Sequence, residues 1–226
     1  MNRILVLSDI HYPLPQSELF SKIIKLENPT KIILLGDIIE PYDQVSALDL
    51  YKEFFDKFSN IFPTKNTVIL IGDNDGLNSD YTVNLEIKNY LDHIPKINSD
   101  ILNYKYKNLF FFHGNIESSY FQESVGKYAA LGLAAINKNL PPMLVAKGVR
   151  KVFNLKENDI AMLGHIHYLN IIGNNIFCGT LCERKIIYSK HDSLGYVLIN
   201  DNEGENIKTE DITLVRLYPD SKSFIK

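Results

Sequence analysis

The chain has 226 residues, 45% of them hydrophobic, which is enough to bury a substantial core and predicts one domain over residues 1–226. Lysine and arginine number 24 against 27 aspartates and glutamates, and the net charge of -3 gives no reason to expect general affinity for nucleic acids or membranes. Two cysteines are too few for a disulfide framework, and no apolar run suits a signal peptide or a membrane span, so we expect a cytoplasmic protein.

Short apolar runs predict the strands of the first part of the chain. They cover residues 4–7, 32–35, 68–71, 109–112 and 160–163, and each ends at a glycine, aspartate or histidine. Their β-branched and aromatic residues are typical of strands buried on both faces. Helical patterns over 17–26 and 45–58 separate the first three runs, and this alternation predicts a mainly parallel sheet in an α/β fold.

The pattern changes after His165 to a series of short strands. Runs at 170–172, 176–178, 185–188, 196–199 and 211–217 are predicted strands, with turn signals at 173–175 and 200–204. They predict a second sheet rich in antiparallel pairs. Two sheets packed face to face, with helices outside, form the simplest assembly.

Residues 116–156 are predicted to form a helical insert between two strands. The stretch 125–140 is apolar on nearly all sides, and Pro141-Pro142 ends it and begins a second helix over 143–153. A helix that is apolar all round must be buried by its own domain or by a partner subunit. A lid, a homodimer contact and a plain core helix are the alternatives, and we favour the homodimer contact.

Five short motifs follow predicted strands at their C-terminal ends. They are Asp9-Ile10-His11, Gly36-Asp37, Gly72-Asp73-Asn74-Asp75, His113-Gly114 and Gly164-His165-Ile166-His167. Functional groups gather outside the carboxyl ends of strands in open α/β sheets. Side chains two residues apart in an extended chain point the same way, so Asp9 with His11 can aim two ligands at one point, and so can the two histidines of the last motif.

Each motif alone has a simple structural explanation as a turn or a buried histidine, but together they place most of the histidines at strand ends. Mixed carboxylate and imidazole ligands suit Mn, Fe, Zn, Ni or Co better than Mg or Ca. Cys178 and Cys182 belong to no motif and are expected to be small buried hydrophobes. His93 and His191 are expected to be structural or solvated.

The ordered set of motifs resembles that of the calcineurin-like metallophosphoesterases from Asp9 to about Arg184. The resemblance implies a four-layer αββα sandwich of two mixed sheets with a binuclear metal centre. It implies that one ion, manganese in our expectation, is held by Asp9, His11, Asp37 and His167. A second ion would be held by Asp37 as the bridging ligand, Asp73, His113 and His165.

Two residues depart from the family pattern. Where the family usually has asparagine the chain has Asp73, and where many members have a proposed proton-donating histidine it has Asn74. A third ligand aspartate leaves the pair of divalent ions with less net positive charge, which weakens attraction for dianionic substrates. Asn74 is unable to act as a general acid because its amide does not titrate.

The expected reaction is two-metal hydrolysis, in which a metal-activated hydroxide attacks phosphorus in line and no protein nucleophile is needed. We expect a small phosphoester substrate, with phosphodiesters preferred over phosphomonoesters, and a catalytic centre that includes Asp37, Asn74 and His113. The alternatives are a catalytically weak metal-binding scaffold for protein contacts and a nuclease of the same family. The four arginines and the lack of a basic-aromatic stripe give no indication of nucleic-acid binding.

Overall fold

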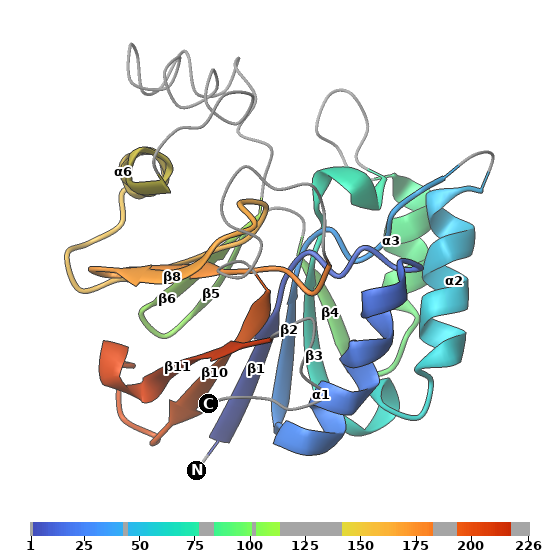
Figure 1. Cartoon of the computed structure of the whole chain (residues 1–226), viewed down its shortest axis with the longest axis horizontal. Helices are drawn as coiled ribbons and strands as arrows, with labels where there is room; N and C mark the ends of the chain where they lie inside the picture. Colours follow the sequence, from blue (N-terminus) through green and yellow to red (C-terminus); the bar gives the residue numbers. More distant parts are fainter. Residues whose placement is uncertain are drawn as a thin grey trace.

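The computed structural model describes residues 2–42, 45–76, 84–100, 103–113, 142–182 and 194–217, and the structural statements that follow concern these residues. They form one sheet of six strands and one of five, with helices on the outer faces (Figure 1). In this part of the chain, no helix combines the length and the apolar character that crossing a membrane requires.

The six-stranded sheet has the order β11-β10-β1-β2-β3-β4. Its strands are β1 (Asn2–Leu7), β2 (Lys31–Leu35), β3 (Asn66–Leu70), β4 (Ile97–Asp100), β10 (Gly195–Asp201) and β11 (Ile212–Arg216). Strands β1 to β4 run parallel, whereas β10 pairs antiparallel with both β1 and β11. The helices that connect the parallel strands are α1 (Leu19–Glu27), α2 (Ala47–Lys57) and α3 (Leu85–Asp92).

The five-stranded sheet has the order β5-β6-β7-β9-β8. Its strands are β5 (Asn103–Tyr106), β6 (Leu109–Phe112), β7 (Ile160–Leu163), β8 (Leu169–Ile172) and β9 (Asn175–Cys178). β7 pairs parallel with β6 and β9, and the outer pairs β5/β6 and β8/β9 are antiparallel. Both sheets are therefore mixed, as expected.

The strands after residue 165 are divided between the two sheets, which corrects the expectation that they form one separate sheet. β8 and β9 join β6 and β7, while β10 and β11 extend the first sheet beyond β1. The five residues at 195–199 are buried, because Tyr196 and Leu198 pack in the helix layer and Val197 and Ile199 pack against the second sheet. The strand expected at 185–188 lies outside the described residues.

Successive side chains along each strand point to opposite faces of its sheet, and this alternation builds four layers. Leu5 and Leu7 of β1 pack with side chains of α1 and α2, whereas Ile4 and Val6 face the second sheet. Figure 1 shows α1, α2 and α3 on the outer side of the first sheet and α6 (Pro142–Val152) beyond the second. The side chains between the second sheet and α6 are Phe110, Phe112, Ala146, Val149, Ala161, Leu163 and Phe177. The predicted αββα order is confirmed.

The helical insert predicted at 116–156 is described only in its second half. α6 confirms the helix expected at 143–153, and Ala146 and Val149 bury its inner face. Residues 116–141, with the lid, homodimer and core-helix alternatives attached to them, lie outside the described part of the chain.

Candidate metal centre

The histidines and aspartates of the five motifs lie where strands of both sheets end. Asp9 and His11 follow β1, Asp37 follows β2, and the short helix η3 (Asp73–Asp75) follows β3 in the first sheet. In the second sheet, His113 follows β6, and the last two histidines of the set follow β7. The carboxyl ends of parallel strands from two packed sheets thus bring residues from distant parts of the sequence to one edge.

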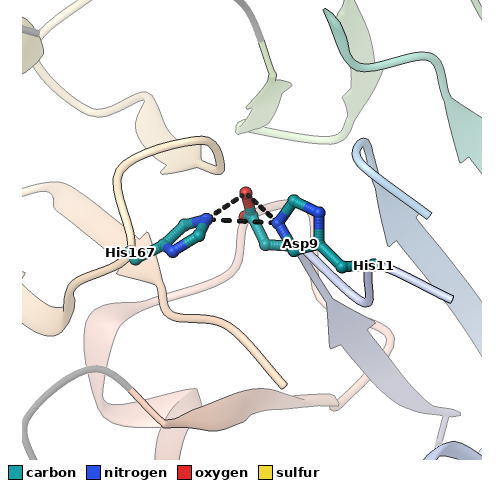
Figure 2. A group of neighbouring side chains, drawn as sticks. All are labelled: Asp9, His11 and His167. Atoms are coloured by element: carbon teal, nitrogen blue, oxygen red, sulfur yellow. Dashed lines mark hydrogen bonds and ion pairs between the residues drawn. The ribbon is translucent and has the colours of Figure 1, made fainter. Parts of the chain in front are cut away.

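Asp9, His11 and His167 form the first group of candidate ligands, and their ligand atoms all lie within 4.8 Å of one another. Figure 2 shows the two imidazole rings and the carboxylate pointing toward a common point. His167 Nε2 is 3.0 Å from Asp9 Oδ1, and the Nε2 atoms of His11 and His167 are 3.3 Å apart. His11 Nε2 is 3.9 Å from the same carboxylate oxygen.

Asp37, His113 and His165 form the second group, again with ligand atoms within 4.8 Å of one another. His113 Nε2 lies 3.4 Å from Asp37 Oδ1, and the rings of His113 and His165 meet edge to face with centroids 5.6 Å apart. Both groups therefore offer two imidazoles and one carboxylate.

The backbone is strained at these residues. Positive φ angles occur at Asp9 (53°), His11 (52°), Asp37 (49°) and His165 (67°), which are four of the nine non-glycine residues with positive φ in the described chain. Left-handed backbone costs free energy in residues with a Cβ and persists only where the surrounding structure enforces it. Its concentration at four candidate ligands indicates that the edge is built for function.

His113 is enclosed by glycines that leave room for its ring. A Cβ at Gly36 would lie 2.2 Å from His113 Cγ, and a Cβ at Gly72 would lie 2.2 Å from Asp37 Oδ1. A Cβ at Gly164 would lie 2.6 Å from His113 Nδ1. The glycines of three motifs are therefore required because the ring and carboxylate approach the backbone closely.

Partners behind the rings orient two of the histidines. His113 Nδ1 is 2.6 Å from the Leu35 carbonyl oxygen, to which it donates, and His11 Nδ1 is 2.8 Å from Glu40 Oε2. A hydrogen bond at Nδ1 fixes the tautomer and turns Nε2 toward the ligand groups.

Asp37 and the loop that carries it are held by η3. The backbone N–H of Asn74 donates to Asp37 Oδ1 at 3.0 Å, and its side-chain Nδ2 donates to Oδ2 at 2.9 Å. Asp75 Oδ1 accepts the N–H groups of Ile38 and Ile39, and its other oxygen accepts that of Gly72 at 2.8 Å. Asn74 thus contacts the carboxylate that the resemblance assigns as the bridge.

The pKa values of several residues in the site are shifted because buried charges lie close together. Burial raises the pKa of Asp9, but the charge and hydrogen bond of His167, together with the charges of His113 and His11, outweigh burial and leave the pKa well below its usual range. Burial lowers the pKa of His167, but the charge and hydrogen bond of Asp9, together with the charge of Asp37, outweigh burial and raise it. Burial and then the charge of Asp37 raise the pKa of Asp75 to about 7.

The donor set fits divalent transition-metal ions. Two Nε2 atoms face one another at 3.3 Å beside a buried carboxylate, an arrangement that a shared cation satisfies better than a single proton does. The second group repeats this chemistry with Asp37.

A comparison with protein-family models finds the calcineurin-like phosphoesterase family over residues 2–201. The chain belongs to this family. It is therefore a phosphoric ester hydrolase, and its substrate is a phosphoester. The two groups of histidine and aspartate, together with the family, indicate a binuclear metal site. No match was found in a comparison with curated proteins.

Solved structures of two phosphoesterases share the fold. YfcE, a phosphoesterase from E. coli, is 17% identical with a TM-score of 0.52, over 99% of this chain and 97% of YfcE. An archaeal phosphodiesterase is 19% identical with a TM-score of 0.50, over 95% of this chain and 99% of the other. At these identities the similarity shows the fold.

Of the seven ligands expected in this phosphoesterase, the structure brings six into two groups of three, and the side chain of Asp73 lies outside the described residues. That these residues bind metal stays a prediction. Cys178 and Cys182 are buried and free, as expected of small hydrophobes. Glu40 was not identified from the sequence as part of the site. Its signal in the sequence is weak, because it is only an acidic residue three positions after Asp37.

Proposed function

We propose that this phosphoesterase hydrolyses phosphodiester bonds with two divalent transition-metal ions, manganese being the ion we expect. The observation that supports this most directly is the pair of groups, each with two imidazoles and one carboxylate, whose ligand atoms lie within 4.8 Å. The first group would hold one ion and the second group the other. The family resemblance adds Asp73 as a further ligand and Asp37 as the bridge.

When bound, the two ions supply a water of lowered pKa and neutralise negative charge on the phosphoryl oxygens. The chain's own residues prepare this centre. Leu35 and Glu40 orient His113 and His11 through their Nδ1 atoms. The two hydrogen bonds from Asn74 hold both oxygens of Asp37 in place. A preorganised ligand set needs no rearrangement when substrate binds.

The substrate preference follows from η3. Asn74 uses its backbone N–H and its side-chain amide on Asp37, and because an amide N–H does not titrate, Asn74 is unable to protonate a leaving group. Asp73 would add a negative charge to the centre, which disfavours dianions. A phosphodiester carries one negative charge at phosphorus, and an aryl leaving group departs without a proton. Aryl phosphodiesters therefore suit the centre best.

Turnover of matched aryl esters tests the proposal. The manganese-loaded protein should hydrolyse bis(p-nitrophenyl) phosphate faster than p-nitrophenyl phosphate. Asp73→Asn should improve monoester turnover, because it removes a negative charge, and Asn74→His should help poor leaving groups most. A preference for the monoester in the unmodified protein, or equal loss of both activities in Asp73→Asn, would contradict the charge argument.

A further inference from the structure

Glu40 contacts a candidate ligand without being one. Its Oε2 atom lies 2.8 Å from Nδ1 of His11, on the side of the ring opposite the Nε2 atom that faces His167. His11 is fully buried, whereas the side chain of Glu40 is 23% exposed, so the carboxylate closes the ring off from the surface.

Backbone hydrogen bonds place Glu40 there. Beyond β1 and β2 the two chains remain paired, because His11 N donates to Asp37 O at 3.0 Å and Tyr12 N donates to Ile38 O at 2.8 Å. Glu40 N then donates to the Tyr12 carbonyl at 2.8 Å. This pairing runs past the ends of the strands and sets Glu40 beside His11.

The two ligand groups differ in this respect. In the second group, the Nδ1 partner of His113 is the neutral carbonyl oxygen of Leu35. In the first group, the Nδ1 partner of His11 is a carboxylate. A carboxylate behind an imidazole fixes its tautomer and makes the opposite nitrogen a stronger electron donor.

We propose that Glu40 is a positioning residue that holds His11 as an Nε2 metal ligand and strengthens the Asp9-His11-His167 group selectively. The inference rests on the proposed function, because it takes this group to be one of the two ion sites. Glu40 accepts the Nδ1 proton of His11, so the Nε2 lone pair points toward Asp9 and His167. The second site, where the Nδ1 partner of His113 is the Leu35 carbonyl oxygen, does not depend on Glu40.

Titration of the metal-free protein with cobalt, followed by calorimetry, tests the selectivity. Wild type should show two sites. Glu40→Ala should weaken one site by about 10- to 100-fold and leave the other unchanged, as loss of an outer partner does elsewhere. The cobalt affinity of the weakened site in Glu40→Gln should lie between those of wild type and Glu40→Ala, because the amide oxygen still accepts the Nδ1 proton but carries no charge.

Glu53→Gln is the matched control. Glu53 Oε1 accepts a hydrogen bond from Tyr12, at 2.6 Å, in the residue next to His11, but the contact supports the loop and not a ligand. This variant should bind both cobalt ions as wild type does. If Glu40→Ala and Glu53→Gln each weakened both cobalt sites to the same extent, the effect would be a general one on the loop, and the proposal would be overturned.

The tautomer of His11 provides a readout that a merely structural role would not move. Nitrogen-15 spectra of the metal-free protein should show His11 protonated at Nδ1 in wild type and redistributed between tautomers in Glu40→Ala. If wild type binds two cobalt ions and Glu40→Ala binds both with unchanged affinity, the proposed role of Glu40 is overturned and the proposed function stands. A wild-type protein that binds no cobalt would overturn the proposed function, and the spectra would then decide whether Glu40 sets the tautomer.

Discussion

The candidate ligands combine reactive side chains with backbone that most residues avoid. His165 has a φ angle of 67°, whereas His167, two residues later, is not among the residues with positive φ. The protein therefore gives up stability at His165 to place one ring among the ligands of the second group. This difference within one motif can be measured.

Paired glycine and alanine substitutions should separate backbone strain from loss of the ring. In the metal-free protein, His165→Gly should be more stable than His165→Ala by about 1 kcal/mol, because glycine adopts the left-handed conformation without a Cβ clash. At His167 the order should reverse, since glycine there only adds entropy to the unfolded chain. Urea unfolding of the four variants measures both differences. The same order at both positions would argue against strain at His165.

At this scale the sequence predicted which histidines and aspartates lie close together, but it did not predict the residues that hydrogen-bond to them. Spacing after strands was sufficient to choose Asp9, His11 and Asp37, because strand ends converge. Glu40 and Asn74 act through hydrogen bonds to those side chains, and nothing in residue type or spacing specifies such contacts. They depend on how the loops after β1, β2 and β3 pair in space.

Between the elements, one carboxylate ties the two sheets together. Asp201, at the end of β10 in the first sheet, accepts hydrogen bonds from Tyr106 at 2.6 Å and from Lys107 at the β5–β6 turn of the second. Burial raises the pKa of Asp201, but the hydrogen bonds from Lys107 and Tyr106 lower it below its usual value. The stabilisation is therefore present above the unfolded pKa of 3.8 and is lost as pH falls through the lower folded pKa.

Asp201→Asn should lower the free energy of unfolding by about 1–3 kcal/mol at pH 7, because a buried charged partner is lost. The difference from wild type should persist down to the unfolded pKa of 3.8 and shrink as the pH falls below it. Urea unfolding at several pH values gives the measurement. Glu210→Gln is the control, since Glu210 is 75% exposed beside Lys208 and should change stability little at any pH. A difference for Asp201→Asn that does not depend on pH would contradict the charge assignment.

The elements show why strands were easier to predict than their pairing. Apolar runs marked β1, β2, β3, β6 and β7, because both faces of each are buried. β4 has the sequence Ile-Asn-Ser-Asp and gave no signal. β10 was predicted as a strand but assigned to the wrong sheet, since its neighbour β1 lies at the other end of the sequence. Local pattern carries no information about such a partner.

For the molecule as a whole, the candidate metal centre joins the two layers of strands. Asp9, His11 and Asp37 come from the first sheet, and His113, His165 and His167 come from the second. Each ligand group contains residues from both sheets. Ions bound there would link the sheets at their shared edge, so metal binding and global stability should be coupled.

Manganese should therefore stabilise the whole fold. An ion that binds only the folded state adds about 2.7 kcal/mol when its free concentration is 100 times its dissociation constant. Urea unfolding with manganese, compared with unfolding in a chelator, should show one transition that shifts to higher urea as the ion concentration rises.

Asp37→Ala should lose both ions if Asp37 is the bridge, and its unfolding curve should then be the same with manganese and with chelator. Elemental analysis of the loaded wild type should give close to two ions per chain. An unfolding midpoint that does not respond to manganese in wild type, or two ions retained by Asp37→Ala, would contradict a bridged centre between the sheets.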